Sequence, residues 1–173
     1  MNKKLSILIP VYNEEKTLLN ILERINESKI ENFDFEIIII NDGSDDDTLN
    51  VIKENSDLYD KVINLDKNRG KGYAVKSGLK IATGDYVIFQ DADLEYDPKE
   101  FIKFTNLINK FSVDVIIGSR FNYSDYIRSH NIANKFGNYI LTLFFNLLYN
   151  TTFTDLYSCY FSFFSNYGAW INK

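Results

Sequence analysis

Tyr86-Val87-Ile88-Phe89-Gln90-Asp91-Ala92-Asp93 is an apolar run that ends abruptly in acid. The apolar residues predict a buried strand, and the Asp91 and Asp93 carboxylates follow it directly. Two carboxylates separated by one residue repel each other unless a cation offsets their charge. Hard oxygen ligands of this kind suit Mg²⁺ or Mn²⁺, which in turn hold a diphosphate. Since an isolated Asp-x-Asp is more often a solvated turn, the rest of the chain must separate the two interpretations.

Length and composition indicate a single globular domain. The chain has 173 residues, enough for one substantial core but too few for two comfortable domains. Acidic residues outnumber basic ones by 24 to 19, so the net charge of -5 gives no general electrostatic reason to bind nucleic acid. The single cysteine, Cys159, cannot form a disulfide within the chain, which favours a reducing, cytoplasmic setting. The longest apolar stretch, Tyr139 to Tyr149, is interrupted by Thr142 and Asn146 and is shorter than the roughly 18 residues that span a bilayer.

Apolar runs and helical patterns alternate along the chain, which predicts βαβ units and a mostly parallel sheet flanked by helices. The run at 36–40 does not alternate with polar residues, as expected for a central strand that is covered on both faces. Strands are expected at 5–9, 36–40, 61–65, 86–90 and 113–118. Helices are expected at 15–28, from a Ser44-x-x-Asp47 capping box through Ile52, over the apolar positions from Ala74 to Ala82, at 101–109 after an Asp97 N-cap, and at 132–149.

Polar side chains follow each of the first four expected strands. In an open α/β sheet, ligands bind at the carboxyl ends of the strands, so these loops form the candidate site. Together they offer an aromatic ring, carboxylates, cations and a metal centre, which are the groups that a nucleoside diphosphate requires. Each loop alone could equally be a turn or a helix entry. The polar and aromatic residues are Tyr12, Asn13 and Glu14 after Pro10, then Asn41, Asp42 and Ser44, then Asn68, Arg69 and Lys71, and finally Asp91, Asp93 and Glu95.

Several other site types are disfavoured. Gly70-Lys71-Gly72 lacks the third glycine of a dinucleotide fingerprint, and the chain has no phosphate loop of the ATPase type. A calcium-binding loop that starts at Asp91 fails because Tyr96 stands where Gly is needed and Ile102 where Glu is needed. An aspartyl-phosphate phosphohydrolase remains an alternative, although its Asp-x-Asp pair would follow the first strand and not the fourth.

The chain contains an ordered series of short motifs. They are Ile9-Pro10-Val11-Tyr12-Asn13-Glu14-Glu15, Asn41-Asp42-Gly43-Ser44-x-Asp46-x-Thr48, Asn68-Arg69-Gly70-Lys71-Gly72, Gly84-Asp85, Asp91-Ala92-Asp93-Leu94, Ile117-Gly118-Ser119-Arg120-Phe121 and Thr154-Asp155. This series resembles that of family-2 glycosyltransferases. The last two motifs resemble the branch that contains dolichyl-phosphate mannose synthases and related polyprenyl-phosphate glycosyltransferases.

The resemblance implies a Rossmann-like GT-A fold, a UDP- or GDP-linked sugar as donor, and Mg²⁺ or Mn²⁺ as cofactor. A metal that bridges the diphosphate would offset the charge that develops as the sugar departs, and an acceptor that is already a phosphate hardly needs a general base. By motif position, the base and ribose would be held by Pro10, Tyr12, Glu14 and Asp42, with Lys71 near the phosphates. Asp91 would reach the ribose or the metal, Asp93 and Glu95 would ligate the metal, Arg120 and Arg128 would contact phosphate, and Asp155 would be the base for a hydroxyl acceptor.

The chain is expected to divide into a nucleotide-sugar-binding half, residues 1–121, and an acceptor side, residues 122–173. Related enzymes continue beyond the Thr-Asp motif, whereas Ser158-Cys159-Tyr160-Phe161 lacks their Arg and Gly and the chain ends at Lys173. We therefore expect an incomplete C-terminal part. The alternative function is a catalytically weak or inactive remnant that binds nucleotide or a partner protein.

The expected helix at 132–149 has one broad apolar face, formed by Phe136, Ile140, Leu143, Phe144, Leu147 and Leu148. Such a face more often packs in a core, but its Phe and Leu content is also typical of a helix at a membrane surface. Association with the cytosolic face of a membrane, near a polyprenyl-phosphate acceptor, therefore stays open. The nearby His130 has no Ser or Cys partner at a recognisable elbow, so we interpret it as a polar residue at the helix entry.

Overall fold

The computed structural model describes residues 2–111, 115–117, 132–154 and 161–164. The chain divides into two compact units, Met1–Ile116 with Ser162–Lys173, and Ile117–Phe161. The first unit holds nearly the whole sheet and the four polar loops, and the second holds one long helix.

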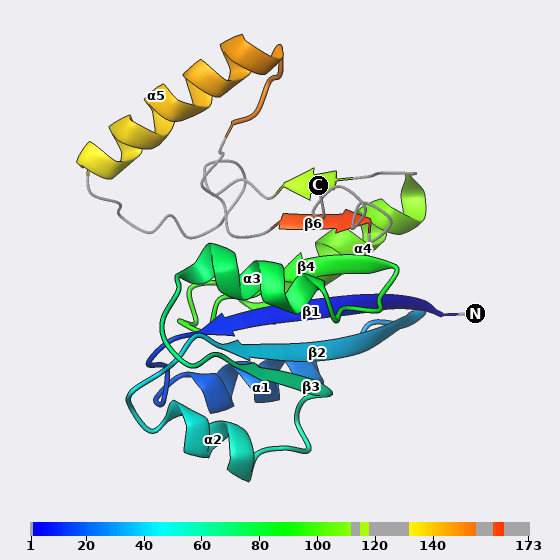
Figure 1. Ribbon diagram of the computed structural model, residues 1–173. Helices are drawn as coiled ribbons and strands as arrows, with labels where there is room; N and C mark the ends of the chain where they lie inside the picture. The colour runs from blue at the N-terminus through cyan, green and yellow to red at the C-terminus, as the bar shows by residue number, and fades with distance from the viewer. Residues whose placement is uncertain (1, 112–114, 118–131, 155–160, 165–173) are drawn as a thin grey trace. The chain divides into compact units, whose positions relative to one another are not determined.

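A mixed sheet forms the centre of the first unit (Figure 1). Its strand order is β3-β2-β1-β4-β6-β5. Strands β3, β2, β1 and β4 pair in parallel with their neighbours in this order, whereas β6 runs antiparallel to β4. The expected mostly parallel α/β sheet is therefore confirmed. The strands are β1 (Lys3–Val11), β2 (Phe33–Asn41), β3 (Lys61–Asn64), β4 (Tyr86–Phe89), β5 (Val115–Ile117) and β6 (Phe161–Phe164).

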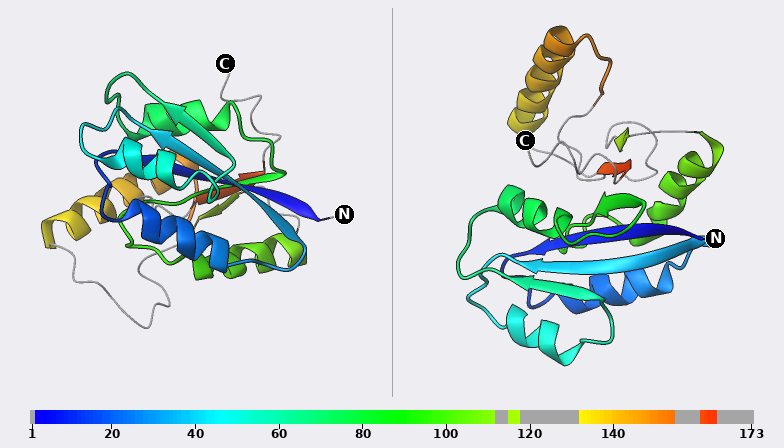
Figure 2. Two further views of the ribbon diagram at one scale, coloured as in Figure 1. Left: turned by 90° about the horizontal axis from the view of Figure 1, so that it is seen from below. Right: turned by 45° about the vertical axis from the view of Figure 1, so that its right-hand side comes forward.

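Helices cover both faces of this sheet. Figure 2 shows α3 on one face and α1 with α4 on the other, as right-handed crossovers between parallel strands require. Asp97 caps the helical segment before α4, because its Oδ1 accepts the Lys99 N–H at 3.0 Å, which confirms the predicted N-cap. The helices are α1 (Leu18–Glu27), α2 (Thr48–Glu54), α3 (Lys71–Leu79), the short 3-10 turn η1 (Pro98–Glu100) and α4 (Phe101–Lys110).

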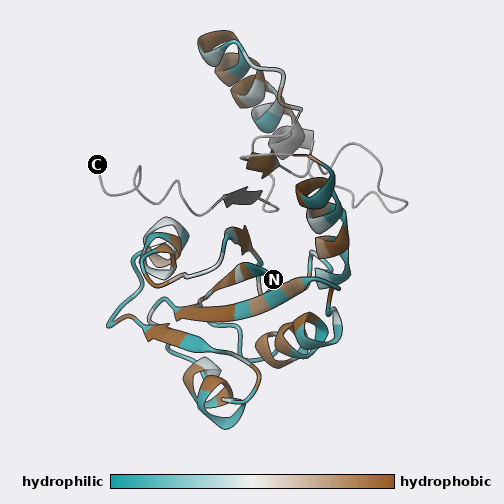
Figure 3. Ribbon diagram, turned by 90° about the vertical axis from the view of Figure 1, so that its right-hand side faces the viewer, coloured by the Kyte–Doolittle hydropathy of each residue, from teal (hydrophilic) through white to brown (hydrophobic). Residues whose placement is uncertain are grey.

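The core lies along β1 and β2. Ile7, Leu8 and Ile9 on β1 and the run Ile38–Ile40 on β2 are fully buried, which confirms that β2 is a central strand. Figure 3 shows much of these strands in brown, the colour of hydrophobic residues. Helix α1 adds an apolar stripe from Leu18 to Ile25, and burying each such side chain contributes about 1.5–3 kcal/mol. The sheet therefore gives the four polar loops a rigid base.

Two features of the first unit differ from the predictions. The segment Phe161–Phe164 forms β6, which the sequence did not predict because four residues are too few to show a period. The predicted capping box before α2 is wrong. Helix α2 starts at Thr48 with Asp47 at its N-cap and no side-chain cap bond, and Ser44 Oγ instead donates to Asn41 Oδ1 at 2.7 Å. The Asn13 N–H, from the loop after β1, donates to Ser44 Oγ and helps to hold Ser44 in that position.

A buried carboxylate fastens the amino ends of the strands. Glu36 Oε1 accepts from Lys61 Nζ at 2.8 Å and Lys4 Nζ at 3.1 Å, and its Oε2 accepts from Ser6 Oγ and from the Thr83 N–H at 2.7 Å. Burial raises the pKa of Glu36, but the bonds from Lys61, Ser6 and Thr83 outweigh it and hold the pKa well below its usual range. Four parts of the chain thus meet on one side chain, far from the polar loops.

The turn before β4 packs tightly against β1. A Cβ added at Gly84 would lie 2.6 Å from the Ser6 backbone N and 2.9 Å from the Lys4 carbonyl oxygen. The Gly84 N–H also donates to Ser6 Oγ at 2.9 Å, and Asp85 Oδ2 accepts the Lys4 N–H at 2.8 Å. The Gly84-Asp85 motif therefore has a structural role in joining this turn to β1.

Helix α5 (Ile132–Tyr149) belongs to the second unit, and its polarity is inverted. Asn138 and Thr142 are buried, whereas the predicted apolar face is exposed. Asn150, the residue after the helix, has φ +51°. The Phe153 N–H then donates to Asn146 Oδ1 at 2.9 Å, which joins the following segment to the end of the helix. Within the described residues, no helix combines the length and the apolar character that crossing a membrane requires. The exposed residues are Phe136, Tyr139, Ile140, Leu141, Leu143, Phe144, Leu147, Leu148 and Tyr149.

Candidate active site

The four polar loops meet at one edge of the sheet. Strands β1 to β4 run parallel, so the loops at 12–17, 42–47, 65–70 and 90–97 all leave the sheet at its carboxyl edge. The chain passes from β1 to β2 on one side and returns to β4 on the other side of β1. This reversal of strand order is the position where open α/β sheets bind ligands.

Lys71 and Asp91 form an ion pair at this edge. The Lys71 Nζ lies 2.5 Å from Asp91 Oδ1. The lysine is the first residue of α3, whereas the aspartate follows β4, so the pair joins loops that are 20 residues apart in sequence. The Asp91 side chain is 16% exposed and that of Lys71 is 52% exposed. The structure thus brings together a predicted phosphate contact and a predicted metal ligand.

Asp42 fixes the loop that carries Lys71. The Asp42 carboxylate is almost fully buried, and its two oxygens accept the backbone N–H groups of Arg69 at 2.9 Å and Gly70 at 2.8 Å. The next residue, Gly43, has φ +69°, and a Cβ there would lie 2.7 Å from the Asn68 backbone N. Only glycine allows this close approach of the two loops. A contact between Asp42 and a base stays a prediction.

The neighbouring Asn41 has a structural role. It is buried at the end of β2, and its Oδ1 accepts the backbone N–H of Ser44 at 3.0 Å and the Ser44 hydroxyl at 2.7 Å. Its Nδ2 donates to Asn64 Oδ1 at 3.2 Å. The amide therefore shapes the turn after β2 and links it to β3.

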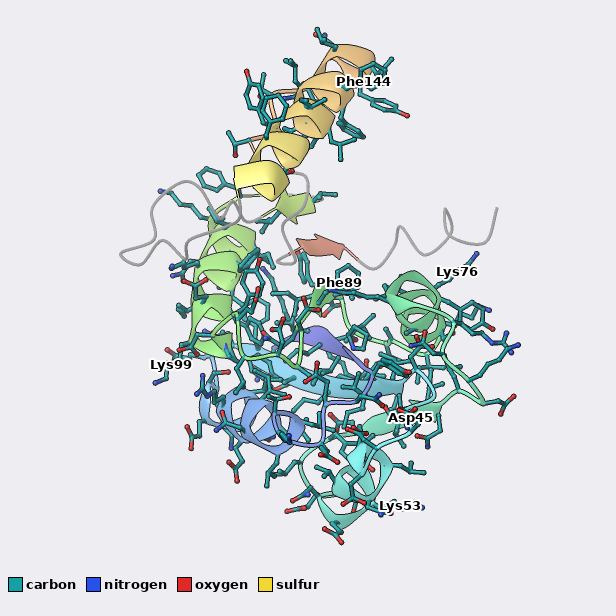
Figure 4. All side chains as sticks on the ribbon, turned by 90° about the vertical axis from the view of Figure 1, so that its left-hand side faces the viewer. Asp45, Lys53, Lys76, Phe89, Lys99 and Phe144 are labelled. Atoms are coloured by element: carbon teal, nitrogen blue, oxygen red, sulfur yellow. The ribbon has the colours of Figure 1, made fainter. Side chains whose placement is uncertain are left out.

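Tyr12 lies on a loop that is clamped to the loop after β2. The neighbouring Asn13 has φ +58°, its Nδ2 donates to Asp45 Oδ1 at 2.6 Å, and its Oδ1 accepts the Asp45 N–H at 3.0 Å. The Asn13 N–H also donates to Ser44 Oγ at 3.1 Å. Figure 4 is viewed toward the carboxyl edge of the sheet, and it labels Asp45 there. Beside this clamp Tyr12 is 43% exposed, so its ring can stack against a planar ligand.

Glu14 and Pro10 occupy more structural positions. The Glu14 N–H donates to Thr48 Oγ1 at 2.8 Å, and the Glu14 carboxylate accepts the Thr17 hydroxyl, so Glu14 is part of the entry to α1. Pro10 is half-buried in β1, where it lies opposite Ile40. The structure therefore places both residues beside the site, and their contact with a base or ribose stays a prediction.

The acidic loop after β4 is held by its own backbone. Asp93 Oδ1 accepts the Glu95 N–H at 2.9 Å across Leu94, which has φ +62°. Gln90 Nε2 donates to the carbonyl oxygens of Asp91 and Tyr96 at 3.0 and 3.1 Å. Asp93 and Glu95 are exposed, whereas Asp91 is half-buried. Across the described ranges, no three His, Cys, Asp or Glu side chains lie close enough to hold one metal ion.

The donor set still suits a magnesium-type ion. Mg²⁺ takes oxygen ligands, and in proteins it commonly has one or two carboxylates, with phosphate oxygens of the substrate and waters in the other positions. Asp91 and Asp93 offer such carboxylates beside a loop that carries Lys71 and Arg69. The residues present therefore fit a divalent cation that arrives with a diphosphate, and they do not form a complete cage.

Arg69 makes a contact that the sequence did not predict. Its guanidinium lies 4.8 Å from the centroid of the Tyr73 ring, and its Nη1 donates to the Tyr73 hydroxyl at 3.1 Å. At an exposed position such a cation–π contact contributes about 0.5–1 kcal/mol. The sequence signal for this contact is the four-residue spacing between Arg69 and Tyr73 at the start of a helix. Arg120, Arg128, His130 and Asp155 lie outside the described residues.

A family model and several known proteins match this chain. The family model described as "Glycosyl transferase family 2" matches residues 6–170. The dolichol-phosphate mannosyltransferase of Pyrococcus furiosus is 37% identical over 119 residues, which cover 68% of this chain and 33% of that protein. The chain spans about a third of the length of the curated relatives it matches.

Two solved structures show the same fold. TarS 1-349 of S. aureus in complex with UDP-GlcNAc is 30% identical with a TM-score of 0.58, and the match covers 66% of this chain and 33% of that one. Glucosyl-3-phosphoglycerate synthase of Mycobacterium tuberculosis in complex with Mn²⁺, UDP and glucosyl-3-phosphoglycerate has a TM-score of 0.71 at 18% identity, covering 95% of this chain and 57% of that one. The GT-A fold expected from the motifs is therefore confirmed.

Proposed function

Because the chain belongs to glycosyl transferase family 2, we propose that it binds a nucleoside-diphosphate sugar with a divalent cation and transfers the sugar to a polyprenyl phosphate. The Lys71–Asp91 pair is the observation that carries the donor part of this proposal. An ammonium beside a carboxylate at the switch point of the sheet supports a site for phosphate and metal there. A solvated acidic turn would not require such a partner on another loop.

In this proposal the base and ribose lie against the loops after β1 and β2. The exposed Tyr12 ring stacks on the base. Lys71 and Arg69 contact the diphosphate from the loop that Asp42 fixes. TarS, which binds UDP-GlcNAc, supports a donor of this class. The ribose and base contacts are assigned to Pro10, Tyr12, Glu14 and Asp42.

Charge on the leaving group is the main chemical problem in sugar transfer. A bound Mg²⁺ or Mn²⁺ would stabilise the negative charge that grows on the diphosphate as the bond to the sugar breaks. Asp91, Asp93 and Glu95 are its proposed protein ligands. Lys71 adds a second positive charge on the same oxygens, so both parts of the pair act on the leaving group.

The proposed acceptor is a polyprenyl phosphate, as the name of the Pyrococcus relative suggests. A phosphate oxygen is already an anion, so its attack on the sugar needs no general base. Arg120 would contact the acceptor phosphate, and Asp155 would act as base only if the acceptor were a hydroxyl. Because polyprenyl phosphates reside in membranes, the exposed apolar face of α5 would lie near the acceptor's bilayer.

A transfer assay tests the proposal. The chain is incubated with Mn²⁺ or Mg²⁺, a panel of UDP- and GDP-sugars, and a polyprenyl phosphate in detergent, and the glycolipid and free nucleoside diphosphate are quantified. We expect one donor to give both products, with loss of activity after metal chelation. Nucleotide binding without transfer or donor hydrolysis would instead identify the chain as a binding module.

A further inference from the structure

The Asp91 carboxylate already has a cation beside it. The Lys71 ammonium contacts it at the carboxyl edge of the sheet. The Asp91 side chain is only 16% exposed, and a carboxylate so shielded from water depends on a nearby positive charge. A metal that uses Asp91 Oδ1 must therefore compete with an ammonium.

The backbone around Lys71 is fixed, so the competition involves the side chain alone. Asp42 accepts the N–H groups of the two residues before Lys71, and Gly70 has φ +87° at the point where α3 begins. The flexible lysine stem can swing while its Cα stays in place.

We propose that Lys71 occupies the place of the divalent cation on Asp91 and gives it up only when the cation arrives with a diphosphate. A bare cation gains Asp91 only by displacing the Lys71 ammonium, a like charge that loses its contact with this carboxylate. A cation that arrives with a diphosphate brings anionic phosphate oxygens, which take over the Lys71 ammonium. Lys71 is then a residue that makes metal and nucleotide binding mutually dependent. This inference rests on the proposed donor site.

The exchange is tested by Mn²⁺ binding without nucleotide. Electron paramagnetic resonance of free Mn²⁺ at low ionic strength gives its affinity for the wild-type chain, Lys71→Met and Lys76→Met. Lys76 is the matched control because it is exposed on the same helix and points away from the sheet in Figure 4. We expect Lys71→Met to bind Mn²⁺ about threefold to tenfold more tightly, as removal of a half-exposed competing charge implies, and Lys76→Met to match the wild type.

A double-variant cycle shows whether the effect acts through Asp91. If it does, Lys71→Met will raise Mn²⁺ affinity in the wild-type background and leave it unchanged in the Asp91→Asn background. In the same variants, Lys71→Met should bind the nucleoside diphosphate without metal several-fold more weakly. Thermal melts show that each variant is folded before its affinities are compared.

The results separate this inference from the proposed function. Unchanged or weaker Mn²⁺ binding in Lys71→Met, including no measurable binding in either protein, overturns the exchange while nucleotide binding by the wild type still supports the donor site. Failure of the wild type to bind any nucleoside diphosphate with Mn²⁺ overturns the donor site itself. A rise in Mn²⁺ affinity that persists in Asp91→Asn also overturns the exchange, because Lys71 would then act elsewhere.

Discussion

The backbone N–H of Arg69 donates to Asp42 Oδ1 at 2.9 Å, so a buried carboxylate at the end of β2 holds the loop that follows β3. The second oxygen takes the Gly70 N–H in the same way. Because Arg69 and Lys71 are the basic residues of that loop, the position of both depends on a side chain that belongs to another strand. Asp42 therefore orders the loop that is proposed to contact the diphosphate, whether or not it touches the ligand itself.

Asp42→Asn should weaken both the loop and the donor site. The amide keeps one acceptor and presents a donor to a backbone N–H, so we expect a loss of about 1–3 kcal/mol in the free energy of unfolding. Nucleoside-diphosphate affinity should fall at least about tenfold, which corresponds to about 1.4 kcal/mol. Denaturant melts and calorimetry measure the two effects. Asp66→Asn, an exposed change of the same charge on the same loop, should alter neither.

Tyr12→Ala should weaken binding of a free nucleoside as well as of the nucleotide sugar, because the exposed ring is proposed to stack on the base. Stacking of this kind contributes about 0.5–1.5 kcal/mol, so a fewfold to tenfold loss of affinity is expected. Tyr12→Phe keeps the ring and should bind as the wild type does. Equal nucleoside affinity in all three proteins would contradict the placement of the base.

Asp93→Asn should leave the fold intact, since its carboxylate is exposed and the bond that it accepts from the Glu95 N–H spans a surface turn. Binding of a nucleoside diphosphate in Mn²⁺ should fall by about tenfold or more, whereas binding in the presence of a chelator should not change. Calorimetry with and without Mn²⁺ measures the difference. The same affinity in the variant and the wild type would exclude Asp93 as a metal ligand.

Glu36→Gln should lower stability and change its dependence on pH. The folded pKa of Glu36 lies below the unfolded value of about 4.5, so its contribution is complete above pH 4.5 and is lost as the pH falls below it. We expect a loss of about 2–3 kcal/mol at pH 7 and a smaller difference from the wild type near pH 3. Denaturant melts across this range test the sign. A difference that grows in acid would contradict it.

Gly84→Ala should destabilise the sheet, because the new methyl group would press on the backbone of Ser6 and Lys4. Overpacking against a fixed backbone costs about 1–3 kcal/mol. Gly72→Ala is the matched control, since it lies on α3 with nothing within 4 Å of its added Cβ. The control should gain about 0.5–1 kcal/mol from its better helix propensity. Thermal melts of the two variants should therefore shift in opposite directions.

The parts of the fold that follow from local pattern could be predicted from the sequence. The apolar runs of β1, β2 and β4 and the Asp97 cap are encoded by neighbouring residues. Ser44 shows the limit, because its hydroxyl donates to Asn41 and accepts the Asn13 N–H from another loop, and it does not cap α2. Strand β6 is too short to show a period, and its place beside β4 depends on a pairing between distant segments.

The site follows the same division. The motifs predicted that Lys71 and Asp91 serve one ligand, and the parallel pairing of β1 with β4 brings the two loops together. The bond between Asp42 and the Arg69 backbone could not be predicted, since it involves peptide groups that carry no residue identity. The order of the strands supplies what the residue types alone do not.

The pairing of β1 with β4 also has a consequence for how the molecule unfolds. Leu5 lies opposite Tyr86, so the two strands that flank the switch point are far apart in sequence. When the sheet opens, the pairing between these two strands is lost as a unit. A ligand held by all four loops then binds only the intact sheet, and at one hundred times its Kd it would add about 2.7 kcal/mol to the free energy of unfolding. The melting temperature should therefore rise with the logarithm of donor concentration, which makes thermal shift a direct screen for the base and sugar that this chain prefers.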